Sequence, residues 1–209
     1  IGLNGGWIDV STLTYKITRY PDKVVITEST DQTGIDDNNI SDYNSYYYSI
    51  QAFNTDGEGG KATSNKVGVG NPFTVPYSCT FETDADFNKW TVIDANQDKV
   101  TWIHYMKTAQ YNYSSTNSGD DWLISPPVTL EKGKAYKVSF DVLTGGMPEK
   151  LKVTFGKDDT AEGQAVVLDE ATYSSQDVIR KTVYLPENIE NDAYRVGLYA
   201  CSDAYKFYI

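Results

Sequence analysis

The chain has 209 residues, enough for one large or two small domains, and carries a formal net charge of −11 at pH 7. It is rich in Tyr, Thr, Val, Asp, Asn and Gly, residues that favour pleated strands and turns, so the composition predicts an all-β protein. The acidic balance argues against nucleic-acid binding, and no apolar run is long enough for membrane insertion.

Residues 1–70 show a first series of short strands separated by turns. Alternating side chains predict strands before and after a turn at Pro21-Asp22, and again after an acidic, turn-rich stretch. A hairpin turn is expected over 56–60, where glycine is frequent. The predicted strands cover residues 13–20, 23–29, 46–54 and 61–69.

The pattern Tyr-x-Tyr-x-Ile-x-Ala-x-Asn at 46–54, followed by Asp-Gly-Glu-Gly at 56–59, resembles the later half of a fibronectin type III domain. The resemblance implies that Tyr46 is the tyrosine-corner residue, with its hydroxyl bonded to nearby backbone. Such a sandwich needs about seven strands, and only those from the third onward are visible after the loop at 5–9. We therefore expect an incomplete domain in a piece of a longer polypeptide, whose other domains are its partners.

Residues 71–76 are predicted to form a linker that two prolines stiffen. The second domain, 77–209, shows short strands at regular spacing with turns between them, which is typical of a sandwich or jelly roll. Its predicted strands are 77–82, 89–94, 100–105, 120–125, 134–144, 150–156, 163–168, 178–185, 193–201 and 205–209.

The run Asp-Asp-Trp-Leu-Ile-Ser-Pro at 120–126 stands before the strand Lys-Ala-Tyr-Lys-Val-Ser-Phe-Asp-Val at 134–142. This sequence pattern resembles the cleaved-adhesin or choice-of-anchor J type of jelly-roll domain, found in secreted and surface proteins of Bacteroidetes-like bacteria. Together the two resemblances imply two tandem β-sandwiches, an incomplete fibronectin type III-like one and then a jelly roll. They also imply a secreted or cell-surface location and a binding module rather than an enzyme.

A loop at 94–98, Asp-Ala-Asn-Gln-Asp, places oxygen-bearing side chains at alternate positions, which can converge on one cation. Lys99 stands where an EF-hand loop has Gly, and the distal Glu is missing, so this is not an EF-hand. In the resembling family this loop and the Glu after the first-strand Phe lie near calcium sites, which implies structural calcium. The candidate ligands are Glu82, Asp94, Asn96, Asp98 and Asp121. The alternative is an ordinary polar turn, in which Asp and Asn cap the backbone.

Aromatic residues gather between positions 102 and 113. Flat rings beside Asn and Asp can stack on sugars, or they can fill the core of a sandwich. The candidate ligand-binding residues are Trp102, Tyr105, Tyr111 and Tyr113. The lone histidine, His104, has no nucleophile near it in the sequence, so we predict no catalytic site. Cys79 and Cys201 are either bonded or two separate buried thiols.

The sequence therefore predicts a non-catalytic binding module of a larger secreted or surface protein. We expect this module to bind a glycan or a host or matrix protein, with calcium stabilising its loops. Loops on a rigid sandwich suit this role because the scaffold orders them in advance. Two alternatives stay open: a structural spacer between other domains, and an accessory region of a secreted hydrolase.

Overall fold

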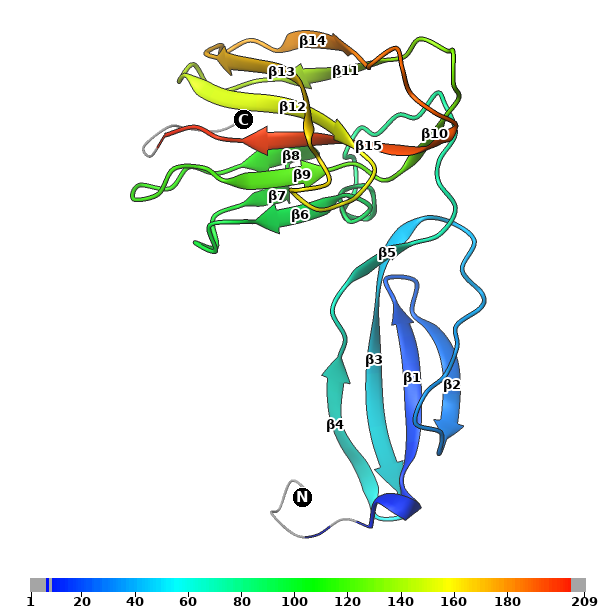
Figure 1. Ribbon diagram of the computed structural model, residues 1–209. Coiled ribbons are helices and arrows are strands. Elements are labelled where there is room, and N and C mark those ends of the chain that lie inside the picture. The colour runs from blue at the N-terminus through cyan, green and yellow to red at the C-terminus, as the bar shows by residue number, and fades with distance from the viewer. Residues whose placement is uncertain (1–6, 8, 204–209) are drawn as a thin grey trace. The chain divides into compact units, whose positions relative to one another are not determined.

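The computed structural model describes residues 7 and 9–203, and the chain divides into two compact units, Ile1–Asn71 and Pro72–Ile209. Antiparallel β-sheets make up nearly all of the regular structure, which confirms the predicted all-β class (Figure 1). The strand predicted at 205–209 and most of the loop at 5–9 lie outside the described residues.

A single sheet forms unit 1, with the strand order β2-β1-β3-β4 and with β5 paired to β3. Its elements are a 3-10 helix at Val10–Thr12, β1 Thr14–Tyr20, β2 Val24–Thr30, β3 Asn44–Asn54, β4 Gly57–Thr63 and β5 Val67–Val69. Ile17 of β1 lies opposite Ile50 of β3, so one sheet face carries the apolar positions of both strands. Tyr46 donates its hydroxyl hydrogen to the carbonyl oxygen of Asp42 at 3.1 Å, the kind of contact that the tyrosine-corner resemblance implies.

A buried guanidinium fixes the acidic segment before β3. Arg19 is 5% exposed and bonds to Asp37 at 2.8 Å and to Asp22 at 2.6 Å. It also donates to the carbonyl of Asn39 at 3.0 Å. A buried charge is tolerated only when it is paired and hydrogen-bonded, so this network ties the segment to one end of the sheet.

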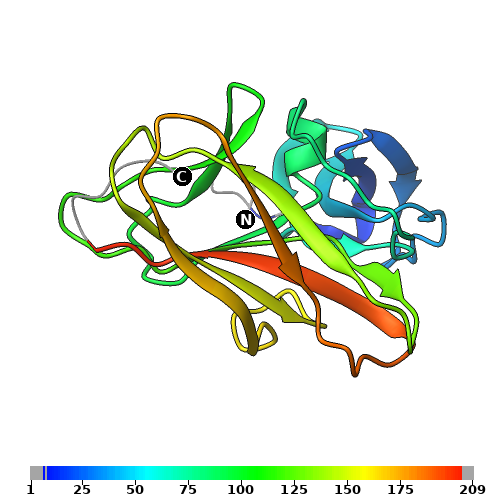
Figure 2. The same ribbon diagram turned by 90° about the horizontal axis from the view of Figure 1, so that it is seen from above.

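Unit 2 contains a larger sheet with the strand order β13-β12-β15-β9-β6 and with β10 paired to β15, and two separate pairs, β11-β14 and β7-β8. Both pairs lie on one side of the larger sheet (Figures 1 and 2). The strands are β6 Thr91–Asp94, β7 Trp102–Tyr105, β8 Thr108–Tyr111, β9 Asp121–Ile124, β10 Val128–Leu130, β11 Lys137–Val142, β12 Glu149–Gly156, β13 Val166–Tyr173, β14 Ile179–Tyr184 and β15 Asp192–Ala200.

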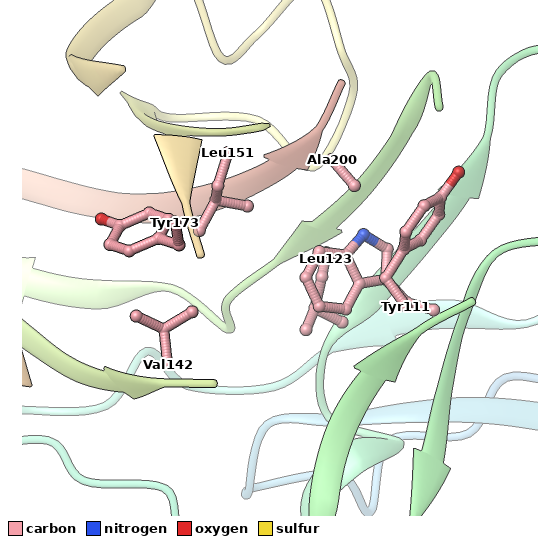
Figure 3. Close-up of a cluster of buried hydrophobic side chains, with 7 residues drawn as sticks. Tyr111, Leu123, Val142, Leu151, Tyr173 and Ala200 are labelled. Atoms are coloured by element: carbon pink, nitrogen blue, oxygen red, sulfur yellow. The ribbon is translucent and has the colours of Figure 1, made fainter. Parts of the chain in front are cut away.

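The core of unit 2 lies between these layers. Its main cluster takes side chains from the larger sheet and from both strand pairs (Figure 3). The buried members are Trp102, Tyr111, Leu123, Val142, Leu151, Tyr173 and Ala200. Leu123 points into this cluster, so its neighbours in β9, Trp122 and Ile124, point to the opposite face of the sheet.

The strand predicted at 77–82 is wrong. These residues are irregular, and a short helix, α1 (Asp84–Phe87), follows them. Phe81 has a φ of 53°, in the left-handed region that a β-strand cannot include. Thr83 then accepts a hydrogen bond from the backbone N–H of Asp86 and caps the helix.

The segment predicted as a linker forms backbone hydrogen bonds at Asn71 and Phe73. Asn71 donates its N–H to Ser41 in unit 1, at 3.0 Å. Phe73 donates to Pro127 at 2.8 Å and accepts from Thr129 at 2.7 Å, so its backbone joins unit 2 beside β10. The boundary between the two units falls at the Asn71-Pro72 bond.

Both cysteines are free thiols and half-buried, so of the two alternatives the structure contains separate thiols. Burial raises the pKa of the Cys201 thiol.

Candidate functional site

A shallow hollow of unit 2 follows the loop between β8 and β9. Two adjoining pockets, of about 520 and 440 Å³, share Thr116 and Asn117 and form one polar groove. We call these the first and second pockets of the groove. The first is lined by Asn96, Thr116, Asn117, Ser118, Gly119, Asp120 and Tyr199, and the second by Asp98, Val100, Tyr113, Ser114, Ser115, Thr116 and Asn117.

The loop on one side of the groove holds its shape through a serine turn. Ser114 accepts hydrogen bonds from the backbone N–H groups of Thr116 and Asn117, at 3.3 and 3.1 Å. Such turns are typical of Ser followed by small polar residues. Just before β9 begins, Gly119 donates its N–H to the carbonyl of Ser202 at 2.8 Å. This bond joins the end of the loop to the segment that follows β15.

The loop on the other side, 94–100, is stabilised by its own carboxylates. Asp94 accepts the N–H groups of Asp98 and Lys99 at 3.1 and 2.9 Å, and Asp98 accepts that of Val100 at 2.8 Å. Gln97 and Lys99 adopt left-handed φ angles of 57° and 69°. These side-chain bonds stabilise a tight turn that such backbone angles would otherwise disfavour.

Two amides join the two loops across the groove. Asn96 donates to the carbonyl oxygen of Ser118 at 3.0 Å, and Asn117 donates to Asp98 Oδ2 at 3.0 Å. The walls of the groove are therefore connected before any ligand arrives, which lowers the entropy lost when one binds.

One residue of the first pocket, Tyr199, belongs to an aromatic pair on the outer face of the larger sheet. Tyr199 donates its hydroxyl hydrogen to Asp120 Oδ1 at 3.0 Å, and its ring stacks on Trp122 with centroids 4.3 Å apart. Lys152 Nζ lies 5.9 Å from the centroid of the Tyr199 ring. Burial, and then the bond to Asp120, raise the pKa of Tyr199, so this hydroxyl stays protonated and donates.

Behind the groove, Asp121 is fully buried and hydrogen-bonded. Its Oδ2 accepts the hydroxyl of Tyr111 at 2.8 Å and the N–H of Asp120 at 3.2 Å, and its carbonyl accepts the indole N–H of Trp102 at 3.3 Å. Burial raises the pKa of Asp121. This network connects the floor of the groove to the core.

The four predicted ligand-binding residues separate in the structure. Trp102 and Tyr111 are 3% and 4% exposed and belong to the core. Tyr105 is 48% exposed but lies at the β7–β8 hairpin, and Tyr113 lines the second pocket. Alternation along β7 could not distinguish a core ring from a binding ring, because both are aromatic.

The five candidate metal ligands also divide. Asp94, Asn96 and Asp98 share one loop, and Asp121 lies opposite Asp94 in the β6–β9 pairing. Glu82 instead pairs with Lys107 at 2.8 Å. Within residues 7 and 9–203, no group of three His, Cys, Asp or Glu side chains is placed to hold a metal ion.

The residues of the site that sequence reasoning missed include Asn117, Asp120 and Tyr199, together with Trp122, on which Tyr199 stacks. Tyr199 and Asp120 are 79 positions apart, and only the pairing of β15 with β9 brings them together. Asn117 stood in a turn-rich loop whose composition alone did not mark it as a pocket wall.

No helix among the described residues is long and apolar enough to cross a membrane. A scan against protein-family models finds no match, and a search of curated proteins finds none.

Several solved structures are similar to the chain. The K1 cleaved adhesin domain of Lys-gingipain from Porphyromonas gingivalis has 19% identity and a TM-score of 0.44, over 57% of this chain and 84% of that one. The C-terminal CBM6 of the laminarinase LamC from Zobellia galactanivorans has 14% identity and a TM-score of 0.36, over 57% and 96%. An arabinoxylan arabinofuranohydrolase from Bacillus subtilis has 10% identity and a TM-score of 0.41, over 78% and 38%. At these levels the likenesses carry no argument about function.

Proposed function

We propose that this chain is a non-catalytic binding module of a secreted or cell-surface protein, and that it binds a glycan in the polar groove. The observation that supports this most is the lining of the two pockets, which is almost entirely hydroxyl, amide and carboxylate, with one tyrosine in each, Tyr199 and Tyr113. A sugar presents many hydroxyl groups, and each needs a donor or an acceptor when it leaves water.

The groove is better arranged for holding a ligand than for cleaving one. A glycosidase needs one carboxyl group kept protonated by an apolar pocket. Asp98 and Asp120 lie in polar surroundings and accept hydrogen bonds from neighbouring groups. His104 is also engaged, since its ring nitrogens lie 2.6 Å from Asp84 Oδ1 and 2.8 Å from the carbonyl of Phe81.

A glycan array with the two-unit chain, followed by titration calorimetry, tests the proposal. We expect Asn117→Ala to weaken binding about tenfold, because this residue lines both pockets and its amide holds Asp98. Asn65→Ala, which changes an exposed amide in unit 1, is the matched control and should bind as the parent does. A blank array, or equal loss in both variants, would count against a sugar site in the groove.

A second candidate, adhesion to a host or matrix protein, is favoured by the tip of the β7–β8 hairpin. Ile103, Tyr105 and Met106 are 38%, 48% and 77% exposed there. Met106 and Lys107 have positive φ angles of 45° and 63°, unusual for such side chains in a two-residue turn. Binding to a matrix protein that is lost with Met106→Ser, together with a blank glycan array, would favour this candidate.

Calcium is the ion that the resemblance implies for unit 2. The 94–98 loop fits it in donor type, since Asp94, Asn96 and Asp98 all offer oxygen atoms, and calcium also accepts carbonyl and water ligands. Of the other two candidates, Glu82 pairs with Lys107, and Asp121 Oδ2 accepts the Tyr111 hydroxyl in the core. We therefore propose that Asp94, Asn96 and Asp98 hold a calcium ion that stabilises this loop.

A further inference from the structure

The charge of the groove has one sign. Among the described residues that line its two pockets, the charged side chains are Asp98 and Asp120, and no Lys, Arg or His lines either pocket. A hydroxyl-binding groove could have carried mixed charges, so this bias concerns the kind of sugar rather than sugar binding itself.

Both carboxylates are held in place before a ligand arrives. Asp120 accepts the Tyr199 hydroxyl on Oδ1, and Tyr199 is itself stacked against Trp122. Asp98 accepts the N–H of Val100 on Oδ1 and the Asn117 amide on Oδ2. A fixed carboxylate loses little entropy on binding, and its remaining lone pairs can accept further donors.

Two lysines close to groove residues do not line the groove. Lys152, on the outer side of Tyr199, lies 3.4 Å from Glu170 and so already has a carboxylate partner. Lys99 follows Asp98 in the chain but is exposed and outside the lining, while Asp94 adds a third carboxylate to the same loop. Charges within about 10 Å still interact at ordinary ionic strength, so an anionic group entering the groove is repelled.

We propose, on the basis of the glycan-binding function above, that the groove selects sugars carrying a protonated amine, of the glucosamine type, over neutral sugars, and rejects anionic ones. The ammonium group would donate to Asp120 or Asp98, as charge-assisted hydrogen bonds do. The amides of Asn96 and Asn117 and the neighbouring hydroxyls would serve the neutral part of the ring.

Three tetrasaccharides separate the possibilities by calorimetry with the full chain, in EDTA and at mildly acidic pH: a glucosamine tetramer, cellotetraose and a galacturonic acid tetramer. Glucosamine and cellotetraose units differ by an amine in place of one hydroxyl. We expect the glucosamine tetramer to bind about fivefold tighter than cellotetraose, with the preference falling as salt is added. The galacturonic acid tetramer should bind most weakly.

Asp120→Asn tests the origin of the preference, because the amide keeps an oxygen for the Tyr199 hydroxyl and removes only the charge. It should bring the two affinities close together, while Asp56→Asn, which removes a charge from unit 1, should leave the preference intact. If Asp120→Asn is poorly folded, Asp98→Asn and the salt dependence of the parent chain replace it.

Equal binding of the glucosamine tetramer and cellotetraose would overturn the inference while the glycan-binding function stands. Tighter binding of the galacturonic acid tetramer would overturn it as well. Absence of binding to any sugar, here and on the array, would overturn both.

Discussion

At the scale of single residues, His104 is a side chain whose protonation contributes to stability. Both ring nitrogens face acceptors, the Asp84 carboxylate and the Phe81 carbonyl, so the doubly protonated ring satisfies both. The bond to Asp84 and then the bond to Phe81 raise the pKa of His104 above 6.5. The charged ring thereby joins β7 to the start of α1.

The raised pKa makes this contribution to stability depend on pH. It is fully present below the unfolded pKa of about 6.5 and is lost as the pH rises through the folded pKa. We therefore expect the melting temperature of the parent chain, relative to His104→Gln, to fall as the pH rises above about 6.5. Thermal melts of the two proteins across this range check it, and a constant difference between them would contradict it.

The contribution of the Tyr111 hydroxyl to stability can also be measured. It donates to the buried carboxylate of Asp121, so Tyr111→Phe leaves that oxygen without one of its donors. We expect a loss of about 1–3 kcal/mol in the free energy of unfolding, from urea denaturation. Tyr184→Phe, at a ring that is 72% exposed, is the control and should change stability by less than about 0.5 kcal/mol.

At the scale of elements, the 94–100 loop decides whether calcium has a structural role. If the ion binds there, millimolar calcium should raise the melting temperature, and EDTA should reverse the rise, because a ligand that binds only the folded state stabilises it. Asp98→Asn should weaken the effect, since it removes one charged ligand. A melt that is the same in calcium and in EDTA would show that the loop's own hydrogen bonds are sufficient.

The elements also show where sequence patterns work. The sequence predicts β3 and β15 within a few residues of their observed bounds, because both are rich in the aromatic and aliphatic residues that favour strands. It missed β10, where three residues after two prolines pair with β15. It placed a strand at 77–82 because a left-handed φ at Phe81 leaves no mark in a hydrophobic pattern.

At the scale of the whole molecule, burial is unequal between the two units. In unit 1, Tyr43 and Tyr46 are the buried hydrophobic residues among those described, whereas the two apolar clusters both lie in unit 2. A single sheet with one apolar face buries little area, and a layered sheet buries much more. Unit 2 is therefore the better scaffold for positioning loops.

The candidate site could be predicted only in part for the same reason. The 94–98 loop and Tyr113 were found from residue type within a short stretch of sequence. The contact of Asp120 with Tyr199 depends on the pairing of β9 with β15, two strands that lie far apart in the sequence. No local pattern encodes the register of that pairing. Polar grooves built between distant strands are therefore the features that sequence patterns alone leave out.

The stack of Trp122 on Tyr199 also gives the molecule a built-in optical signal. The indole is one hydrogen bond and one ring contact away from Asp120, which lines the groove. Any molecule that displaces or reorients the Asp120 carboxylate changes the surroundings of the phenol and so those of the indole. Intrinsic tryptophan emission can thus register occupancy of the groove without an attached dye, and a Trp122→Phe variant identifies which of the four tryptophans carries the change.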